Sequence, residues 1–200
     1  MNVKISDCIA PNFYDFHKAV KSGKHTEYWL RGGRGATKSS VISIENILDI
    51  MQDPFANGVV FRRFENEIRD SVFGQIKWAV NKLGVEHLFK FNVSPFKVTY
   101  APTGQVIIFK GADNPQKIKS INLGTGYIKF AWFEEVDQFN GMEEIRNIQQ
   151  SIFRGTTKKQ IAFFSYNPPK SARSWVNAET KIHKKGRLVH YSDYRSVPPE

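Results

Sequence analysis

The chain has 200 residues, of which 40% are hydrophobic and 24% are charged, a composition that suits one globular domain with a full core. No apolar run is long enough to span a membrane, and the first residues lack the apolar segment of a signal peptide. The single cysteine, Cys8, excludes an internal disulfide framework and fits a reducing cytoplasm. The net charge of +10 favours a polyanionic partner, although charge alone does not distinguish DNA, RNA and an acidic protein.

Helical and strand patterns alternate along the first half of the chain. Apolar residues at i, i+3 and i+4 indicate helices, and short β-rich runs before turn residues indicate strands. The expected elements are a lead-in segment at 1–27 with a helix over 12–21, a strand at 27–30, a helix from Ser39 to the stop at Pro54, a strand at 58–61 and a helix over 65–83.

The second half is richer in strands. Three β-rich runs at 89–93, 97–100 and 106–109 come first, with a hairpin turn at 102–104. The remaining expected elements are a polar loop at 111–126, a buried strand at 127–133, a helix over 141–153, a buried strand at 160–165, a helix near 173–184 and a strand near 187–191. This order predicts an α/β domain with a mainly parallel central sheet, flanked by helices on both faces and carrying an inserted β-hairpin.

A glycine-rich loop follows the first expected strand, with the sequence Gly-Gly-Arg-Gly-Ala-Thr-Lys-Ser-Ser from Gly32 to Ser40. Such a loop can turn several backbone N–H groups toward a phosphate, while the lysine adds charge and the hydroxyl holds Mg²⁺. The match to the phosphate-loop pattern is imperfect, because Thr37 stands where the second glycine belongs. Arg34 inside the loop is also unusual. A plain turn before a helix is the alternative interpretation.

Two acids, Glu134 and Glu135, end the buried strand at 127–133. In a magnesium–nucleotide site, the first would hold the metal through water and the second would activate the attacking water. The alternative is an acidic cap of the following element. The phosphate-loop candidate favours the first interpretation, because both loops would share the carboxyl edge of a parallel sheet. Ser165 and Asn167 end the next buried strand, where they could sense a γ-phosphate or simply form a turn.

Together these motifs resemble the ATPase domain of the large terminase subunit of tailed bacteriophages, in the branch found in phages and prophages of Gram-positive bacteria. The resemblance rests on the Gly32–Ser40 loop, on Val59–Arg63 followed by Arg69–Trp78, on Trp132–Val136 and on Ser165–Pro169. It implies a RecA-like ATPase of the additional-strand catalytic-glutamate (ASCE) P-loop class that uses ATP and Mg²⁺ to drive double-stranded DNA into a procapsid. It also implies a homo-oligomeric ring on the portal, the small terminase subunit as a partner, no membrane, and residence in the host cytoplasm rather than in the mature virion.

The resemblance also assigns roles to individual residues. Lys38 would contact the β- and γ-phosphates, Ser39 would ligate Mg²⁺, and Arg34 would help to bind or polarise the γ-phosphate. Glu134 would be the Walker B acid, Glu135 the catalytic glutamate, and Ser165 and Asn167 the coupling motif. The whole implied ATP-binding loop comprises Gly32, Gly33, Arg34, Gly35, Ala36, Thr37, Lys38, Ser39 and Ser40.

Weaker candidates surround this set. Arg62, Arg63, Phe13 and Tyr14 are candidates for the adenosine pocket, with surface charge and core packing as alternatives. A trans-acting arginine finger has no clear candidate: Lys119 precedes the Walker B strand and Arg154 follows the next helix. A basic cluster, which comprises Lys181, Lys184, Lys185 and Arg187, either contacts DNA phosphates or is a solvated face.

The domain organisation and the alternatives complete the prediction. We expect one ATPase domain over 1–200, without the C-terminal nuclease of a complete large terminase and without nuclease activity. The competing hypotheses are a helicase-like nucleic-acid ATPase, and a nucleotide- or DNA-binding assembly module with little turnover by itself, monomeric in isolation.

Overall fold

The computed structural model describes residues 3–121, 123–155 and 158–197. In this part of the chain, the core is one eight-stranded sheet with the order β3-β4-β5-β2-β6-β7-β1-β8. Only β4 runs against the other strands. The strands are β1 Glu27–Gly32, β2 Ala56–Arg62, β3 Phe89–Val93, β4 Phe96–Tyr100, β5 Val106–Gly111, β6 Tyr127–Glu134, β7 Ile161–Tyr166 and β8 Arg187–Ser192. The mixed, mostly parallel sheet confirms the predicted fold class, and the hairpin turn expected at 102–104 joins the antiparallel strands β4 and β5. Strand β4 also pairs antiparallel with β3.

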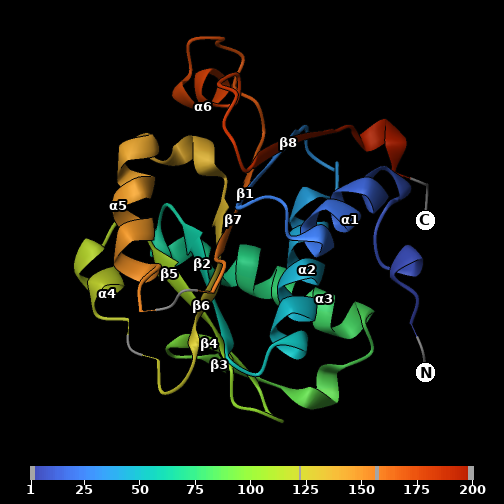
Figure 1. Ribbon diagram of the computed structural model, residues 1–200, viewed down its shortest axis with the longest axis vertical. Coiled ribbons are helices and arrows are strands. Elements are labelled where there is room, and N and C mark those ends of the chain that lie inside the picture. Colours follow the sequence, from blue (N-terminus) through green and yellow to red (C-terminus); the bar gives the residue numbers. More distant parts are fainter. Residues whose placement is uncertain (1–2, 122, 156–157, 198–200) are drawn as a thin grey trace.

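Helices cover both faces of this sheet (Figure 1). The first three helices lie on one face, and α4 and α5 lie on the other. A short helix, α6, stands at the end of the molecule where β1 and β7 finish. The helices are α1 Tyr14–Ser22, α2 Lys38–Gln52, α3 Gly74–Lys82, α4 Pro115–Lys119, α5 Met142–Ile152 and α6 Trp175–Glu179. None of the helices in the described residues is both long and apolar enough to cross a bilayer.

Alternate residues of the central strands pack into two separate hydrophobic cores, one on each face of the sheet. In β1, Leu30 packs with the face covered by α1–α3, whereas Trp29 packs with the face covered by α5. Phe163 and Phe164 in β7 divide in the same way, since successive side chains of a strand point to opposite faces. Because both faces are buried, these strands read as continuous apolar runs, which is why the sequence identified them readily.

Two predicted helices differ from the structure. The helix expected over 65–83 is divided into a short 3₁₀ turn, a π-helical turn at Arg69–Phe73 and α3. The Phe73 N–H donates to the Ile68 carbonyl, five residues back, at 3.1 Å. This wide turn buries the neighbouring side chains Val72 and Phe73 together, which a regular helix would point in different directions.

The helix expected near 173–184 is limited to α6. Its end follows from Arg187, whose Nη1 donates to the Glu179 carbonyl at 2.8 Å. The same guanidinium donates to the Glu179 carboxylate at 2.7 Å. The same carbonyl also accepts from the Ile182 N–H, three residues on, at 3.1 Å, so the chain leaves the helix in a tight turn to which this arginine is bound.

Candidate functional site

Three loops meet at the carboxyl edge of the sheet. Because β7 lies between β1 and β6, the loops that follow these strands are neighbours. They enclose a hollow of about 300 Å³, here called the three-loop hollow. It is lined by Arg34, Gly35, Ala36, Thr37, Lys38, Ser39, Ser40, Gln75, Glu134, Glu135, Tyr166 and Asn167. The structure therefore brings together most of the site residues expected from the sequence.

Lys38 is buried at the first position of α2 and closes the glycine-rich loop on itself. Its Nζ donates to the carbonyls of Gly32 and Gly33 at 2.8 and 2.9 Å, and to Asn167 Oδ1 at 3.1 Å. Burial lowers the pKa of Lys38, while the nearby carboxylates, Glu134 first among them, act in the opposite direction. The third of these hydrogen bonds, to Asn167, thus joins the loop after β1 to the loop after β7.

A hydrogen-bonded chain crosses the floor of the hollow. Ser39 Oγ donates to Glu134 Oε1 at 2.6 Å, and Ser165 Oγ donates to the other carboxylate oxygen. Trp132 Nε1 in turn donates to Ser165 Oγ at 2.7 Å. Burial raises the pKa of Glu134, and the two serine hydroxyls offset part of that effect.

Glu135 is held from below by an arginine at the end of β2. Arg62 is only 5% exposed, and its Nη2 lies 2.9 Å from Glu135 Oε2 and 2.7 Å from Glu67 Oε2. The neighbouring Arg63 pairs with Glu144 on α5 at 2.9 Å. Both arginine side chains pair with carboxylates, and neither is among the residues that line the three-loop hollow. A role of these two residues in an adenosine pocket stays a prediction.

Two residues of the site have left-handed backbones without being glycine. Thr37 has φ +53° and Glu135 has φ +50°, and they are the non-glycine residues with positive φ in the described part of the chain. A left-handed conformation costs an L-residue about 1–2 kcal/mol, and a β-branched threonine adopts it especially rarely. Thr37 therefore takes the conformation for which a phosphate loop ordinarily has glycine, with its side chain retained.

Arg34 is exposed at the mouth of the three-loop hollow. Its side chain forms no hydrogen bond or ion pair with the described residues. It is therefore a cation beside the hollow that no protein carboxylate neutralises.

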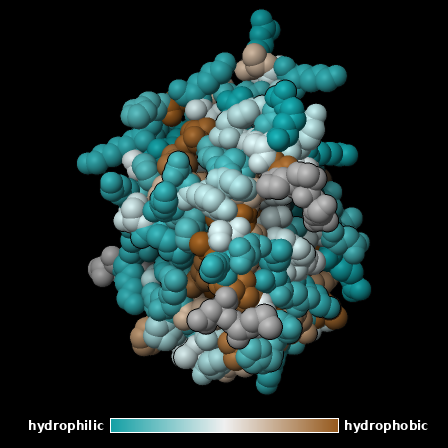
Figure 2. All heavy atoms as spheres, turned by 90° about the vertical axis from the view of Figure 1, so that its right-hand side faces the viewer, coloured by the Kyte–Doolittle hydropathy of each residue, from teal (hydrophilic) through white to brown (hydrophobic). Residues whose placement is uncertain are grey.

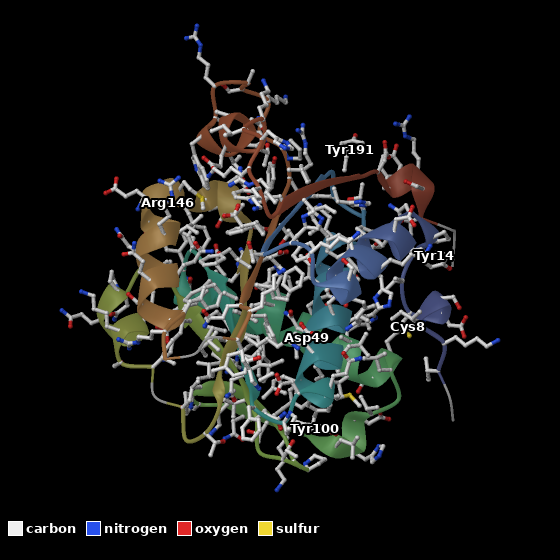
Figure 3. The ribbon with its side chains drawn as sticks, viewed as in Figure 1. Cys8, Tyr14, Asp49, Tyr100, Arg146 and Tyr191 are labelled. Carbon is white, nitrogen blue, oxygen red and sulfur yellow. The ribbon has the colours of Figure 1, made fainter. Side chains whose placement is uncertain are left out.

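A second hollow of about 730 Å³ adjoins the first and shares Thr37, Ser40 and Gln75 with it. Its walls are the N-terminal segment Ser6–Pro11, the π-helical turn, α3 and Val197. Tyr14 lines this side hollow and lies near Cys8 (Figure 3). On the face that carries α1, hydrophobic atoms are visible among mostly hydrophilic ones (Figure 2). The structure separates the two aromatic candidates, because Phe13 is fully buried against Phe16 and His190.

The candidates for an arginine finger lie elsewhere. Arg154 Nη2 donates to the Lys119 carbonyl at 3.3 Å, and both residues line a hollow of about 850 Å³ between α4 and α5. This hollow is on the sheet face opposite α1–α3. Neither residue reaches the three-loop hollow of its own chain.

Sequence patterns missed several residues of the site. Gln75 donates to Ser40 Oγ at 3.4 Å, but it comes from the irregular segment that was expected to be a plain helix. Asp137 acts electrostatically on Lys38, and burial raises its pKa. A Cβ placed on Gly35 would lie 3.6 Å from Tyr194 Cβ, so the segment after β8 borders the glycine-rich loop. Two of these carried a signal: Asp137 is a third acid two residues after the expected pair, and Gln75 lies in a segment that carried the family resemblance without an assigned role.

Comparisons with known proteins show which family the chain belongs to. The family described as phage terminase large subunit matches residues 24–195. The large terminase subunit of Bacillus phage SPP1 is 41% identical over 201 residues, covering 98% of this chain and 47% of that protein. The chain thus spans about half the length of this relative. The match to a phage of a Gram-positive host also confirms the predicted branch.

Solved structures share the fold at low sequence identity. The large terminase of a thermophilic bacteriophage has a TM-score of 0.70 at 14% identity, over 92% of this chain and 45% of that one. Its complexes with ADP and with ATP-gamma-S give TM-scores of 0.69 and 0.68. The N-terminal domain of the DNA packaging ATPase from bacteriophage phi29 gives 0.65 at 13% identity, over 90% of this chain and 95% of that one. The chain belongs to the phage terminase large subunit family.

Proposed function

We propose that this chain is the ATP-hydrolysing domain of a viral motor that packages double-stranded DNA into a procapsid. The observation that carries the proposal is the meeting of Lys38 and Ser39 with Glu134 and Glu135 in the three-loop hollow. Family membership supports it, as do the nucleotide complexes of the thermophilic phage terminase. The proposed partners are double-stranded DNA, the portal and the small terminase subunit, with a homo-oligomeric ring as the working state in the host cytoplasm.

The donor groups of the hollow fit a magnesium–triphosphate. Backbone N–H groups at the start of α2, the Lys38 ammonium and the unpaired Arg34 guanidinium suit phosphate oxygens. Ser39 and Glu134 offer a hydroxyl and a carboxylate oxygen within 2.6 Å of each other, the hard ligands that Mg²⁺ prefers. When bound, Mg²⁺ would neutralise charge on the β- and γ-phosphates.

Within this proposal, each residue has a distinct task in the reaction. Lys38 exchanges its carbonyl acceptors for phosphate oxygens, and Arg34 stabilises charge on the γ-phosphate. Glu135 orients the attacking water and accepts its proton, because it is the more exposed of the two acids and has the hollow in front of it. Asn167, which binds Lys38 Nζ, reports the loss of the γ-phosphate to the loop after β7. The side hollow, with Tyr14, would hold the nucleoside.

One observation favours slow turnover by the isolated domain. The Glu135 carboxylate is already engaged: its Oε2 lies 2.9 Å from Arg62 Nη2 and accepts from Gln138 Nε2 at 2.6 Å, so this oxygen is not free to accept a hydrogen bond from an attacking water. The domain could thus act mainly as a nucleotide-binding module until a neighbouring subunit or DNA rearranges this pair. Turnover per chain measured across protein concentration separates these cases: a rise indicates sites completed by another subunit.

The proposal is tested with two variants that separate binding from chemistry. Lys38→Ala is expected to weaken the binding of a fluorescent ATP analogue, whereas Glu135→Gln should bind it normally and lose hydrolysis by about 100-fold or more. Lys77→Ala is the control, because this exposed lysine on α3 lies outside both hollows. Hydrolysis by Glu135→Gln at the wild-type rate would refute the assignment of the base.

A further inference from the structure

The chain makes a long excursion between β7 and β8, over residues 168–186. This excursion, which contains α6, extends beyond the body of the molecule at the top of Figure 1, and the same end is largely hydrophilic in Figure 2. It begins directly after Asn167 and therefore on the same edge of the sheet as the three-loop hollow.

The excursion has an unbalanced charge. Its sequence contains five basic residues and one acid, Glu179. Glu179 is buried and already paired with Lys184 at 2.5 Å and with Arg187 at 2.7 Å. The four remaining cations are exposed and make no side-chain hydrogen bond or ion pair with the described residues: Lys170, Arg173, Lys181 and Lys185.

The structure leaves only part of the basic cluster expected from the sequence free to bind a partner. Arg187 is buried and Lys184 is neutralised, so two of its four members are structural. Lysines elsewhere show the contrast, since Lys21 and Lys129 both lie within 4 Å of Asp49. The four exposed cations of the excursion have no such partners, so their electrostatic fields add instead of being cancelled by nearby carboxylates.

The excursion is anchored to the domain, so its cations are presented on an ordered base. Within the excursion, Asn177 Nδ2 donates to the carbonyls of Pro169 and Ser171 at 2.9 and 3.0 Å. Two further hydrogen bonds join the excursion to the rest of the domain. Trp175 Nε1 donates to the Phe139 carbonyl at 3.0 Å, and Tyr166 OH shares a hydrogen bond with Thr180 at 3.1 Å.

The base of the excursion is also connected to the phosphate-binding lysine. Asn167 accepts from Lys38 Nζ, and Lys170 follows three residues later, so at most about 10 Å of chain separates them. Any movement of Asn167 when Lys38 changes partners would therefore reach the excursion directly.

We propose that the excursion is the surface through which this domain contacts the phosphate backbone of duplex DNA. This inference rests on the proposed packaging function, which supplies DNA as the partner. Exposed, unpaired cations suit a sequence-independent phosphate contact. Recognition of an acidic protein would also require an apolar core, and of the large apolar side chains at 168–186 only Ile182 is exposed.

The test measures binding of a fluorescently labelled 30-bp duplex by anisotropy between 50 and 200 mM salt. The first variant replaces the four cations, Lys170, Arg173, Lys181 and Lys185, by alanine. The control variant removes the same charge from four exposed lysines outside the excursion: Lys4, Lys24, Lys77 and Lys90. Each lost phosphate contact lowers the slope of log K against log salt by about 0.9. We expect the first variant to lose about 2–4 from that slope and at least about tenfold in affinity at 100 mM salt.

The control variant is expected to keep most of the wild-type slope, and both variants should keep wild-type ATP binding and melting temperatures. Equal losses in the two variants would mean that DNA responds only to total charge and would overturn the inference, as would a first variant with unchanged binding. Failure of the wild-type chain to bind ATP would instead refute the proposed function, and ATP binding without any DNA binding would refute both the DNA-handling role and this surface.

Discussion

Replacement of Glu134 by glutamine tests the electrostatics of the site without changing its shape. The carboxylate is buried, and its hydrogen bonds come from the neutral hydroxyls of Ser39 and Ser165. Burial raises its pKa above that of an exposed glutamate, so the folded state binds this proton more tightly than the unfolded state does. Stability therefore falls as the pH rises from the unfolded pKa of about 4.3 through the raised folded value.

The size of the effect follows from linkage. Each unit by which the pKa is raised costs about 1.4 kcal/mol once the group is ionised in both states. A glutamine carries no charge, and its amide can still accept from Ser39 and donate to Ser165. We therefore expect Glu134→Gln to be more stable than the wild-type chain at neutral pH, and each 1 kcal/mol of gain would appear as about 2–4 °C in Tm for a domain of this size. The gain should shrink below about pH 4.5, where the wild-type carboxyl is protonated as well.

Thermal melts from pH 4 to pH 8, without nucleotide or Mg²⁺, measure this difference. Glu135→Gln is the matched control: its carboxylate is 38% exposed and pairs with Arg62, so its removal should not stabilise the fold. If Glu134→Gln melts at or below the wild-type temperature across the range, or if its gain is independent of pH, the carboxylate is not destabilised by burial.

Three further substitutions probe the supports of the site. Ser165→Ala should lower stability by about 1–3 kcal/mol in denaturant titrations, because Trp132 Nε1 loses its acceptor; an unchanged midpoint would count against that hydrogen bond. Thr37→Gly should raise stability by up to about 1 kcal/mol, since relief of the left-handed strain exceeds the entropy cost of glycine; a loss of more than about 1 kcal/mol would contradict the strain. Arg62→Lys should cost roughly 1 kcal/mol in thermal melts, because one ammonium replaces a guanidinium beside Glu135, and an unchanged Tm would argue against this pair.

The sequence predicted the elements of the fold better than their arrangement. Strands β6 and β7 were recognisable because both of their faces are buried, which produces apolar runs broken only by Lys129 in β6 and Ser165 in β7. The order in which β7 enters between β1 and β6 depends on pairing between distant segments and has no local signature. That order is nevertheless what places the three predicted loops side by side.

The same limit applies to individual side chains of the site. Lys38 and Ser39 belong to one motif and Glu134 to another, and the joint role of these motifs in a nucleotide site implies that they meet. The Arg62–Glu135 pair joins residues that only the sheet brings together, so the sequence offered Arg62 for a different task. The π-helical turn is similar, because its extra residue per turn depends on how Val72 and Phe73 pack against the sheet.

The strained backbone at Thr37 and Glu135 has a consequence for how nucleotide binding reaches the rest of the domain. Each left-handed residue costs about 1–3 kcal/mol, and this cost persists only where surrounding contacts compensate for it. Those contacts include the three hydrogen bonds of Lys38 and the ion pair between Glu135 and Arg62. A triphosphate that binds Lys38 competes with all three of its present acceptors, and Asn167 is the one at the base of the basic excursion. Because the excursion begins directly after Asn167, exchange of this hydrogen bond would couple the phosphate site to the surface that we propose contacts DNA.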